Sequence, residues 1–347
     1  MTDYENLISV AVGFRLEGDR IAIVTLIGNN GTSPRPIGSQ MVVSEDGRSA
    51  GFLTGGCAEN VIVDDTLAAL AEGKNRYLRL GAGSPYIDVR LPCGAGIDLF
   101  IDTGVGDDVL NKLNDSIRSR VPVAIDTYLA SQGDHCCVFE QNKALLPGTF
   151  RRWFYPKRRL LILGKGPNVL ALNRVALASE HEVMVTSPDA ATLAENEGVG
   201  AEVKMFSTPS GVSCTLVDPW TAAVLMFHEH EWEPELLETL LATDCFYIGA
   251  LGSRRTHQQR LNVLTERGLA KVDDRLYGPV GIAIGAATPM EIAISVLAEV
   301  TDVYRQAARP LLVVGQIKQE NSHASHPTAM PKKPISVKAA GAIRSHT

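Results

Sequence analysis

The sequence lacks the features that would send a chain into or across a membrane. No run approaches the roughly 18 unbroken apolar residues that a membrane-spanning helix needs. The opening segment, MTDYENLISVAVGF, has acidic residues at Asp3 and Glu5 where a secretory signal carries basic ones. We therefore expect a soluble cytoplasmic protein that does not associate with membranes.

Positive charge is also scarce. The 347 residues include 33 Lys and Arg against 39 Asp and Glu, which gives a formal net charge of −6. Proteins that bind nucleic acids in general present a basic surface that displaces counterions from phosphates. This charge balance argues against a nucleic acid as the partner.

Cysteine is sparse and scattered. The six cysteines stand at positions 57, 93, 136, 137, 214 and 245, without any C-x-x-C pair. This spacing argues against a disulfide scaffold and a zinc ribbon, so we expect reduced thiols. Catalytic triads, paired-acid motifs and HExxH-like patterns are missing too, and we predict neither a catalytic site nor a resident metal site.

The first 146 residues alternate short β-type runs with helical stretches, which predicts a mixed α/β domain over residues 1–146. Helices are expected at Glu59–Glu72 and Val109–Arg118, where apolar residues recur at helical spacing. The predicted strands are Ile21–Ile27, Gln40–Ser44, Ser49–Leu53, Asp88–Leu91, Ile97–Asp102 and Val121–Thr127.

Residues 147–158 are rich in turn residues, aromatics and positive charge, and we assign them to a linker. From residue 159 to residue 310, strands alternate regularly with helices, which predicts a Rossmann-like domain with a parallel sheet. The strands expected there are Leu160–Leu163, Glu182–Thr186, Ala201–Met205, Ala222–Phe227 and Phe246–Ala250. The predicted fold class is therefore α/β.

The last helix of the Rossmann-like domain has the clearest start signal in the chain. Thr288 is a suitable N-cap, Pro289 fits the first helical position, and Glu291 completes a capping box. The helix should run to about Arg309. Residues 317–347 are polar, with no periodic apolar face, and predict a disordered tail.

Two cysteines lie in loops of small residues. Cys57 follows Gly55 and Gly56 at the start of a predicted helix, whose N-terminus favours a thiolate, and Cys93 precedes Gly94. Glycine lets a bulky ligand approach the backbone closely, so the two thiols would make a soft-ligand site. The alternative is that both cysteines are buried and structural, as free cysteines commonly are.

Two other segments are candidates for binding anions. Arg35 lies in a glycine-containing loop between strands, where it would suit an anionic ligand or simply be solvated. Gly252, Ser253, Arg254 and Arg255 follow a predicted strand and open a helix. Backbone N–H groups at a helix start, together with paired guanidinium groups, favour an anion there.

The turn Gly164-Lys165-Gly166 between a strand and a helix is similar to the start of a dinucleotide-binding fingerprint. Val169 replaces its third glycine, and Ser187 stands where an acid would bind the ribose. NAD binding is therefore weakened as an interpretation. A phosphate or pyrophosphate on the helix N-terminus needs only backbone donors.

His228 and His230 follow a predicted buried strand. Residues two apart on an extended segment point the same way, so the two imidazoles would be able to share a metal or ligand. The alternative is that they are polar loop residues.

Taken together, these segments resemble the XdhC/CoxI family of xanthine dehydrogenase accessory factors over most of residues 5–305. The matching segments are GTSPRPIGSQMVVSEDGRSAGFLTGGCAEN, LPCGAGIDLFID, LLILGKGP, FHEHEWE, YIGALGSRR and GPVGIAIGAATPMEIAISVLAEV. The resemblance implies an accessory chaperone rather than an enzyme. Such a protein binds molybdopterin or its cytosine dinucleotide form as cargo, protects it while a terminal sulfur is installed, and delivers it.

The resemblance also implies site residues and partners. It makes Cys57 and Cys93 the first choice for cofactor contacts and has Arg254 and Arg255 neutralise the cofactor phosphate. The remaining predicted cofactor-binding residues are Gly55, Gly56, Gly94, Arg35, Gly164, Gly166, Gly252 and Ser253. The implied partners are a xanthine dehydrogenase or aldehyde oxidoreductase-type molybdoenzyme, a cysteine desulfurase and a second copy of the chain.

Two other functions stay open. An NAD(P)-dependent oxidoreductase would use the Rossmann-like domain and would enhance NADH fluorescence on binding. A pure protein adaptor with a degenerate nucleotide fold would bind a hydroxylase without any cofactor.

Overall fold

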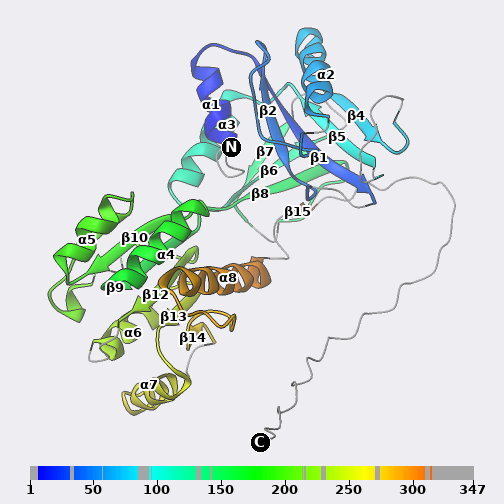
Figure 1. Ribbon diagram of the computed structural model, residues 1–347. Coiled ribbons are helices and arrows are strands. Elements are labelled where there is room, and N and C mark those ends of the chain that lie inside the picture. The colour runs from blue at the N-terminus through cyan, green and yellow to red at the C-terminus, as the bar shows by residue number, and fades with distance from the viewer. Residues whose placement is uncertain are drawn as a thin grey trace, which may run out of the picture. The chain divides into compact units, whose positions relative to one another are not determined.

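The computed structural model describes residues 7–31, 35–56, 58–84, 94, 96–129, 134–140, 143–212, 214, 216–227, 232–269, 274–308 and 313–314. Strands within these residues form three sheets, named here sheets A, B and C (Figure 1). Sheets A and B are antiparallel and sheet C is parallel. The predicted order of a mixed α/β part followed by a Rossmann-like parallel sheet is confirmed. The predicted tail, residues 317–347, lies outside the described residues.

Sheet A has five strands in the order β3-β2-β1-β5-β4. Their bounds are β1 Ile21–Asn30, β2 Gln40–Ser44, β3 Ser49–Ala50, β4 Arg76–Gly81 and β5 Gly96–Asp102. Strand β2 ends where the sequence predicted, β1 extends further to Asn30, and β3 stops at Ala50. Strand β4 was not predicted, and the strand expected at Asp88–Leu91 lies outside the described residues.

Both faces of sheet A are covered, because alternate residues of a strand point to opposite sides. Helix α2 (Glu59–Glu72), which has the predicted bounds, packs on one face against residues such as Val24 and Leu99. Helices α1 (Leu7–Leu16) and α3 (Asp107–Arg118) pack on the other face, which includes Ile23. The strands are therefore apolar on both sides.

Sheet B has the order β15-β8-β6-β7. Its strands are β6 Val123–Tyr128, β7 His135–Val138, β8 Thr149–Phe154 and β15 Val313–Val314. Strand β8 corrects the prediction of a linker in this segment. Phe150 and Trp153 are buried, so the aromatic residues that suggested an irregular connection instead fill the core and pair with β6.

Sheet C has six strands in the order β11-β10-β9-β12-β13-β14. The strands are β9 Arg159–Gly164, β10 Glu182–Ser187, β11 Glu202–Met205, β12 Thr221–Met226, β13 Tyr247–Ala250 and β14 Leu276–Tyr277. Counted from β9, this is the 3-2-1-4-5-6 order of dinucleotide-binding folds. The helices are α4 Pro167–Ala178, α5 Ala190–Glu197, α6 Glu233–Leu241, α7 Arg254–Glu266 and α8 Pro289–Ala308, with a 3₁₀ turn η1 at Pro209–Gly211.

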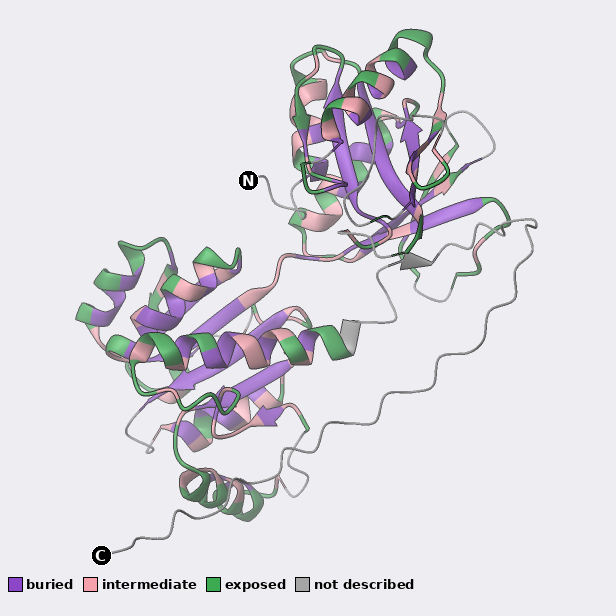
Figure 2. Ribbon diagram, turned by 45° about the vertical axis from the view of Figure 1, so that its right-hand side comes forward, coloured by how far each residue is buried: buried purple, intermediate pink, exposed green. Residues whose placement is uncertain are grey.

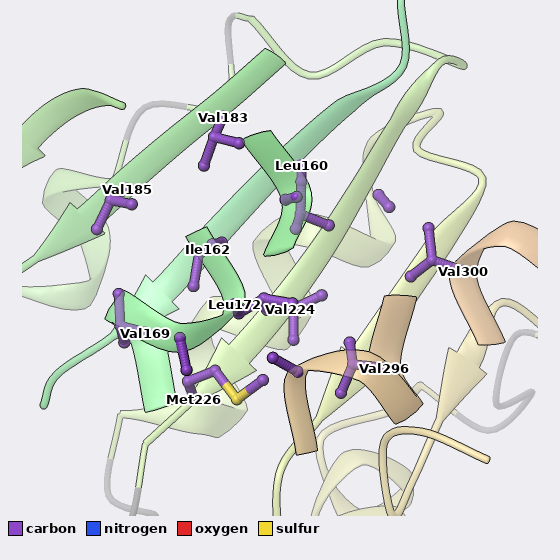
Figure 3. Packing of buried hydrophobic residues seen from close by; sticks show 14 of the residues in the cluster. Leu160, Ile162, Val169, Leu172, Val183, Val185, Val224, Met226, Val296 and Val300 are labelled. Carbon is purple, nitrogen blue, oxygen red and sulfur yellow. The ribbon is translucent and has the colours of Figure 1, made fainter. Parts of the chain in front are cut away.

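Helices cover both faces of sheet C (Figure 2). Helices α4, α5 and α8 pack on the face that carries Leu160, Ile162 and Val224 (Figure 3). Helices α6 and α7 pack on the opposite face, against Leu163 and Leu225. Continuous burial along β9 and β12 follows, as expected for parallel strands enclosed on both sides.

The predicted start of α8 is confirmed. The Glu291 carboxylate accepts hydrogen bonds from the backbone N–H groups of Ala287 and Thr288 at 2.8 and 2.9 Å. The Thr288 hydroxyl accepts from the Glu291 N–H at 3.3 Å, which completes the capping box. In the described part of the chain, α8 and every other helix fall short of the length and apolarity that crossing a bilayer requires.

Candidate functional site

One edge of sheet A gathers the segments that carry the predicted N-terminal site residues. Asn30 at the end of β1 pairs with Gly96 at the start of β5, and Gly96 also pairs with Gly81 at the end of β4. Strand β2 starts with Gln40, and β3 ends with Ala50, on this same side. The segments that follow β1, β3 and β4 therefore leave sheet A from the same edge, which we call the loop edge.

The glycines of these segments leave open space around the backbone. Gly55, Gly56 and Gly94 have positive φ angles of 79°, 102° and 67°, which L side chains rarely adopt. A Cβ atom built on any of them would meet nothing within 4 Å. Cys57 and Cys93, each next to one of these glycines, lie outside the described residues.

Glu59, whose role the sequence pattern did not reveal, organises the segment between β3 and α2. Its carboxylate accepts hydrogen bonds from the N–H groups of Leu53 at 3.2 Å, Thr54 at 2.9 Å and Ala58 at 3.2 Å. It also accepts from the Thr54 hydroxyl at 2.5 Å, and that hydroxyl in turn accepts from the Ala58 N–H at 3.0 Å. The backbone on both sides of position 57 is thus tied to one acidic side chain.

The Glu59 carboxylate also changes the electrostatics expected at the start of α2. Burial raises its pKa, but the Thr54 hydroxyl and the backbone donors outweigh burial, so the pKa is lowered overall. The carboxylate is therefore ionised at neutral pH and occupies the Ala58 N–H, a donor at the helix N-cap. A thiolate at position 57 would receive less stabilisation from the helix than the sequence alone suggested.

An ion pair lies beneath the β4–β5 hairpin at the loop edge. The Arg79 guanidinium contacts the Asp98 carboxylate at 2.5 Å and donates to the Ala82 carbonyl at 3.0 Å. Gly96 is packed against this pair, because a Cβ there would lie 2.5 Å from the Ala82 carbonyl oxygen. The base of the segment that contains Gly94 is therefore closely packed, while Gly94 itself is exposed. Arg35, in the segment after β1, is half-buried.

The Gly164-Lys165-Gly166 turn lies after β9, at the point where the strand order of sheet C reverses. A Cβ on Gly164 would lie 2.7 Å from the Met226 carbonyl oxygen, so β12 requires glycine there whether or not a ligand binds. Gly166 has φ 84° and open space, but its N–H already donates to the Thr192 hydroxyl at 3.0 Å. Val169 is fully buried in the helix–sheet core.

The end of β10 lacks the acid that would bind a ribose. Ser187 is fully buried, and its hydroxyl accepts from the Asp189 N–H at 3.1 Å. The Asp189 carboxylate caps α5 by accepting from the Thr192 N–H at 2.8 Å and the Thr192 hydroxyl at 2.6 Å. These hydrogen bonds, aided by the charge of nearby Lys165, lower the pKa of Asp189. An ionised carboxylate beside the turn opposes a second negative charge there.

Two exposed guanidinium groups open α7, after the carboxyl end of β13. Ser253 caps the helix by accepting from the Thr256 N–H at 3.1 Å, and Gly252 has φ 145°. Arg254 and Arg255 are the first two residues of the helix, and both are exposed. This arrangement, which the sequence predicted, presents positive charge at the carboxyl edge of sheet C.

The structure brings some predicted residues together but not all. Gly55, Gly56, Gly94 and Arg35 belong to segments of the loop edge, whereas the remaining described residues of the predicted site lie at the carboxyl edge of sheet C. His228 and His230 lie outside the described residues. Within the described residues, no group of three His, Cys, Asp or Glu side chains is placed to hold a metal ion.

These features define a class of protein. A sheet of Rossmann order that lacks the ribose-binding acid follows an antiparallel part that presents open, glycine-flanked segments at one edge. The fold is that of nucleotide-binding proteins, but the best-formed open surface lies on sheet A.

Comparison with known proteins assigns the family. Residues 14–81 match the XdhC and CoxI family, and residues 160–300 match the XdhC Rossmann domain. The chain is 31% identical over 302 residues to the molybdenum cofactor insertion chaperone PaoD of Escherichia coli (strain K12), an alignment that covers 87% of this chain and 89% of PaoD. The chain therefore belongs to the XdhC and CoxI family, which confirms the resemblance seen in its motifs.

Two further comparisons agree. The chain is 23% identical over 327 residues to a probable xanthine dehydrogenase component of Bacillus subtilis (strain 168), covering 84% of this chain and 95% of that protein. A crystal structure of a xanthine dehydrogenase from Bacillus halodurans has a TM-score of 0.72 and 24% identity. That match covers 86% of this chain and 96% of the other, and it establishes a shared fold.

Proposed function

We propose that this protein is a molybdenum cofactor chaperone. It binds the cofactor as cargo, protects it while a terminal sulfur is installed, and inserts it into a molybdoenzyme of the xanthine dehydrogenase or aldehyde oxidoreductase type. The observation that carries the proposal is the 31% identity, over most of both chains, to PaoD, which is named as an insertion chaperone. On this proposal the chain acts as an accessory protein rather than as an enzyme.

The proposed cargo site is the loop edge of sheet A, with Cys57 and Cys93 as the contacts to molybdenum or its sulfur ligands. A molybdenum dithiolene is soft, oxygen-sensitive and polyanionic, and thiolates suit a soft metal centre. The open space around Gly55, Gly56 and Gly94 fits a bulky pterin, because no side chain occupies it. Arg35 supplies a positive charge to the same group of segments.

The carboxyl edge of sheet C is the proposed second contact, for the phosphate of the cofactor. Arg254 and Arg255 neutralise that phosphate, helped by Gly252 and Ser253 at the start of α7. Gly164 and Gly166 contribute less, because Met226 packs on the first and Thr192 takes the N–H of the second. Either molybdopterin or its cytosine dinucleotide form is compatible with these donors.

The proposal extends to partners and location. The client is a molybdoenzyme of the type named above, a cysteine desulfurase supplies the sulfur, and a homodimer shields the cargo from water and oxygen. We propose that these steps take place in the cytoplasm. The work is shared between an N-terminal part, residues 1–146, and a Rossmann-like part, residues 159–310.

The test is cofactor retention by cysteine variants purified without oxygen. We expect Cys57→Ala and Cys93→Ala to lower the molybdopterin bound per chain at least several-fold, because each removes a soft ligand. Cys136→Ala is the matched control, since Cys136 is an exposed cysteine of β7, outside the proposed site. Bound pterin is measured as its oxidised fluorescent derivative.

Equal retention by all three variants would remove both cysteines from the site and leave the chaperone role without its chemistry. An NAD(P)-dependent oxidoreductase is the second candidate, favoured by the strand order of sheet C. The buried Ser187 and the committed N–H of Gly166 weigh against it, because the ribose and the pyrophosphate would each lack a partner.

A further inference from the structure

A small polar cluster interrupts the apolar core between sheets A and B. Thr25 of β1, Gln40 of β2 and Asp102 of β5 line a cavity together with Thr127 of β6. Gln40 and Asp102 are only 5% and 4% exposed. The other lining residues are apolar: Ile8, Ile23, Val105, Leu113, Ile125 and Phe154.

The side-chain amide of Gln40 is only half used by the protein. Its Nε2 donates to the Thr25 hydroxyl at 3.0 Å, whereas its Oε1 is buried and has no hydrogen-bond partner among the described residues. A buried polar atom without a partner loses the hydration it had in the unfolded chain. Exchanging the amide oxygen and nitrogen would place Nε2 at the same spot, where it would need a partner just as much.

Asp102 provides further acceptor capacity on the cavity wall. One carboxylate oxygen contacts His135 Nε2 at 2.5 Å, and the other accepts from the Gly104 N–H at 3.0 Å. Each carboxylate oxygen has two lone pairs, so a second hydrogen bond to either oxygen is available. Thr127 adds a hydroxyl, which both donates and accepts.

The size of the cavity decides what fits. Its volume is about 10 Å³, and a single water molecule needs roughly 10–15 Å³ of such space together with two to four polar partners. Divalent cations bind roughly six or more oxygen ligands, which four polar side chains engaged in other bonds do not supply. The cavity is also too small for any organic ligand.

We propose that this cavity is a binding site for one structural water molecule. The water donates one hydrogen to Gln40 Oε1 and the other to the Asp102 carboxylate, and it accepts from the Thr127 hydroxyl. It thereby satisfies the one unpartnered atom of the cluster. It also links strands of sheet A to a strand of sheet B, beneath the loop edge that Gln40 helps to form.

Magnetic relaxation dispersion of oxygen-17 water tests the proposal on the full chain. The method counts waters that stay bound for longer than the protein takes to tumble. We expect Gln40→Met, which keeps the side-chain length but removes the amide, to lower that count by one. Gln258→Met is the matched control on the exposed surface of α7 and should leave the count unchanged.

Equal counts in the unaltered chain and in Gln40→Met would overturn the proposal. If Gln40→Met does not fold, a crystal structure of the unaltered chain decides instead. Density for one oxygen within hydrogen-bond distance of the Gln40 amide supports the site. A Gln40 amide bonded directly to Asp102, with no such density, rejects it.

Discussion

Glycine-rich turns at the loop edge of sheet A and at the carboxyl edge of sheet C look alike in the sequence, yet they are built differently. In sheet C, Gly164 is pressed against the Met226 carbonyl, and the N–H of Gly166 is taken by Thr192. At the loop edge, Gly55 and Gly56 have open space on the side where a Cβ would stand. A glycine pattern therefore marks a ligand site only where the freed space is not already used by the protein.

The two edges also differ in charge. A carboxylate lies beside the turn at each place, Asp189 in sheet C and Glu59 at the loop edge, and each is held ionised by hydrogen bonds. Each accepts backbone N–H groups at the start of a helix. Helix N-termini that already hold an acidic side chain are poor anion sites, which leaves the exposed Arg254 and Arg255 as the better phosphate partners.

The largest expected effect separates the two kinds of glycine. Gly164→Ala should lower the free energy of unfolding by about 3 kcal/mol, because the added methyl group is forced against the β12 backbone. Gly56→Ala meets no atom, so its cost should be roughly 1–2 kcal/mol, from the positive φ alone. Urea unfolding measures both.

Cofactor retention should show the opposite order, with Gly56→Ala losing more cargo than Gly164→Ala does in its folded fraction. If Gly164→Ala proves the less destabilising of the two, the Met226 contact does not explain that glycine.

Acidification should affect sheet C before the loop edge. Burial and the neighbouring charge of Arg158 lower the pKa of His181 from its ordinary 6.5 to about 4. Between these values only the unfolded chain binds the proton, so stability falls as pH decreases from 6.5 towards 4, by about 2 kcal/mol at pH 5. Glu59, whose pKa is lowered, contributes stability that is lost only below its ordinary value of 4.5.

Urea unfolding of His181→Leu at pH 7, 6 and 5 checks the first part of this prediction. The variant should show a flatter dependence of unfolding free energy on pH than the unaltered chain. An unchanged slope would mean that His181 takes up its proton in the folded protein as readily as in the unfolded one.

The smallest expected effect concerns Glu59. Glu59→Gln keeps the size of the side chain but weakens its hydrogen bonds to the Thr54 and Ala58 N–H groups, at a cost of about 1 kcal/mol after allowance for solvent screening. Hydrogen exchange at these two amides should quicken, and cofactor retention should fall. Glu72→Gln, at the other end of α2, is the matched control. Exchange that quickens equally in both variants would assign the effect to general loss of helix charge.

Local signals made much of the fold predictable. The capping box of α8, from Thr288 to Glu291, needs only neighbouring residues, and α2 is bounded by Gly73 in a left-handed conformation. Strand β4 was missed because Arg76 and Arg79 look solvent-exposed in the sequence. Their partners, Asp65 and Asp98, come from other elements. Strand β8 was taken for a linker for a similar reason, since its aromatic residues find their core only in the folded chain.

The candidate site was predictable in position but not in construction. The glycines and arginines were found from their spacing after strands. The role of Glu59 depends on its side chain folding back over residues 53–58, and the role of Gly164 depends on Met226 of a different strand. Both are contacts made by the fold, which a pattern of residue types along one segment does not contain.

The most direct measurement of the central claim is mass spectrometry of the small molecules released from protein purified without oxygen. We predict a molybdenum-containing pterin, as molybdopterin or its cytosine dinucleotide, and no enhancement of NADH fluorescence when the nucleotide is added. Release of a nicotinamide dinucleotide, with fluorescence enhancement on titration, would contradict the chaperone role.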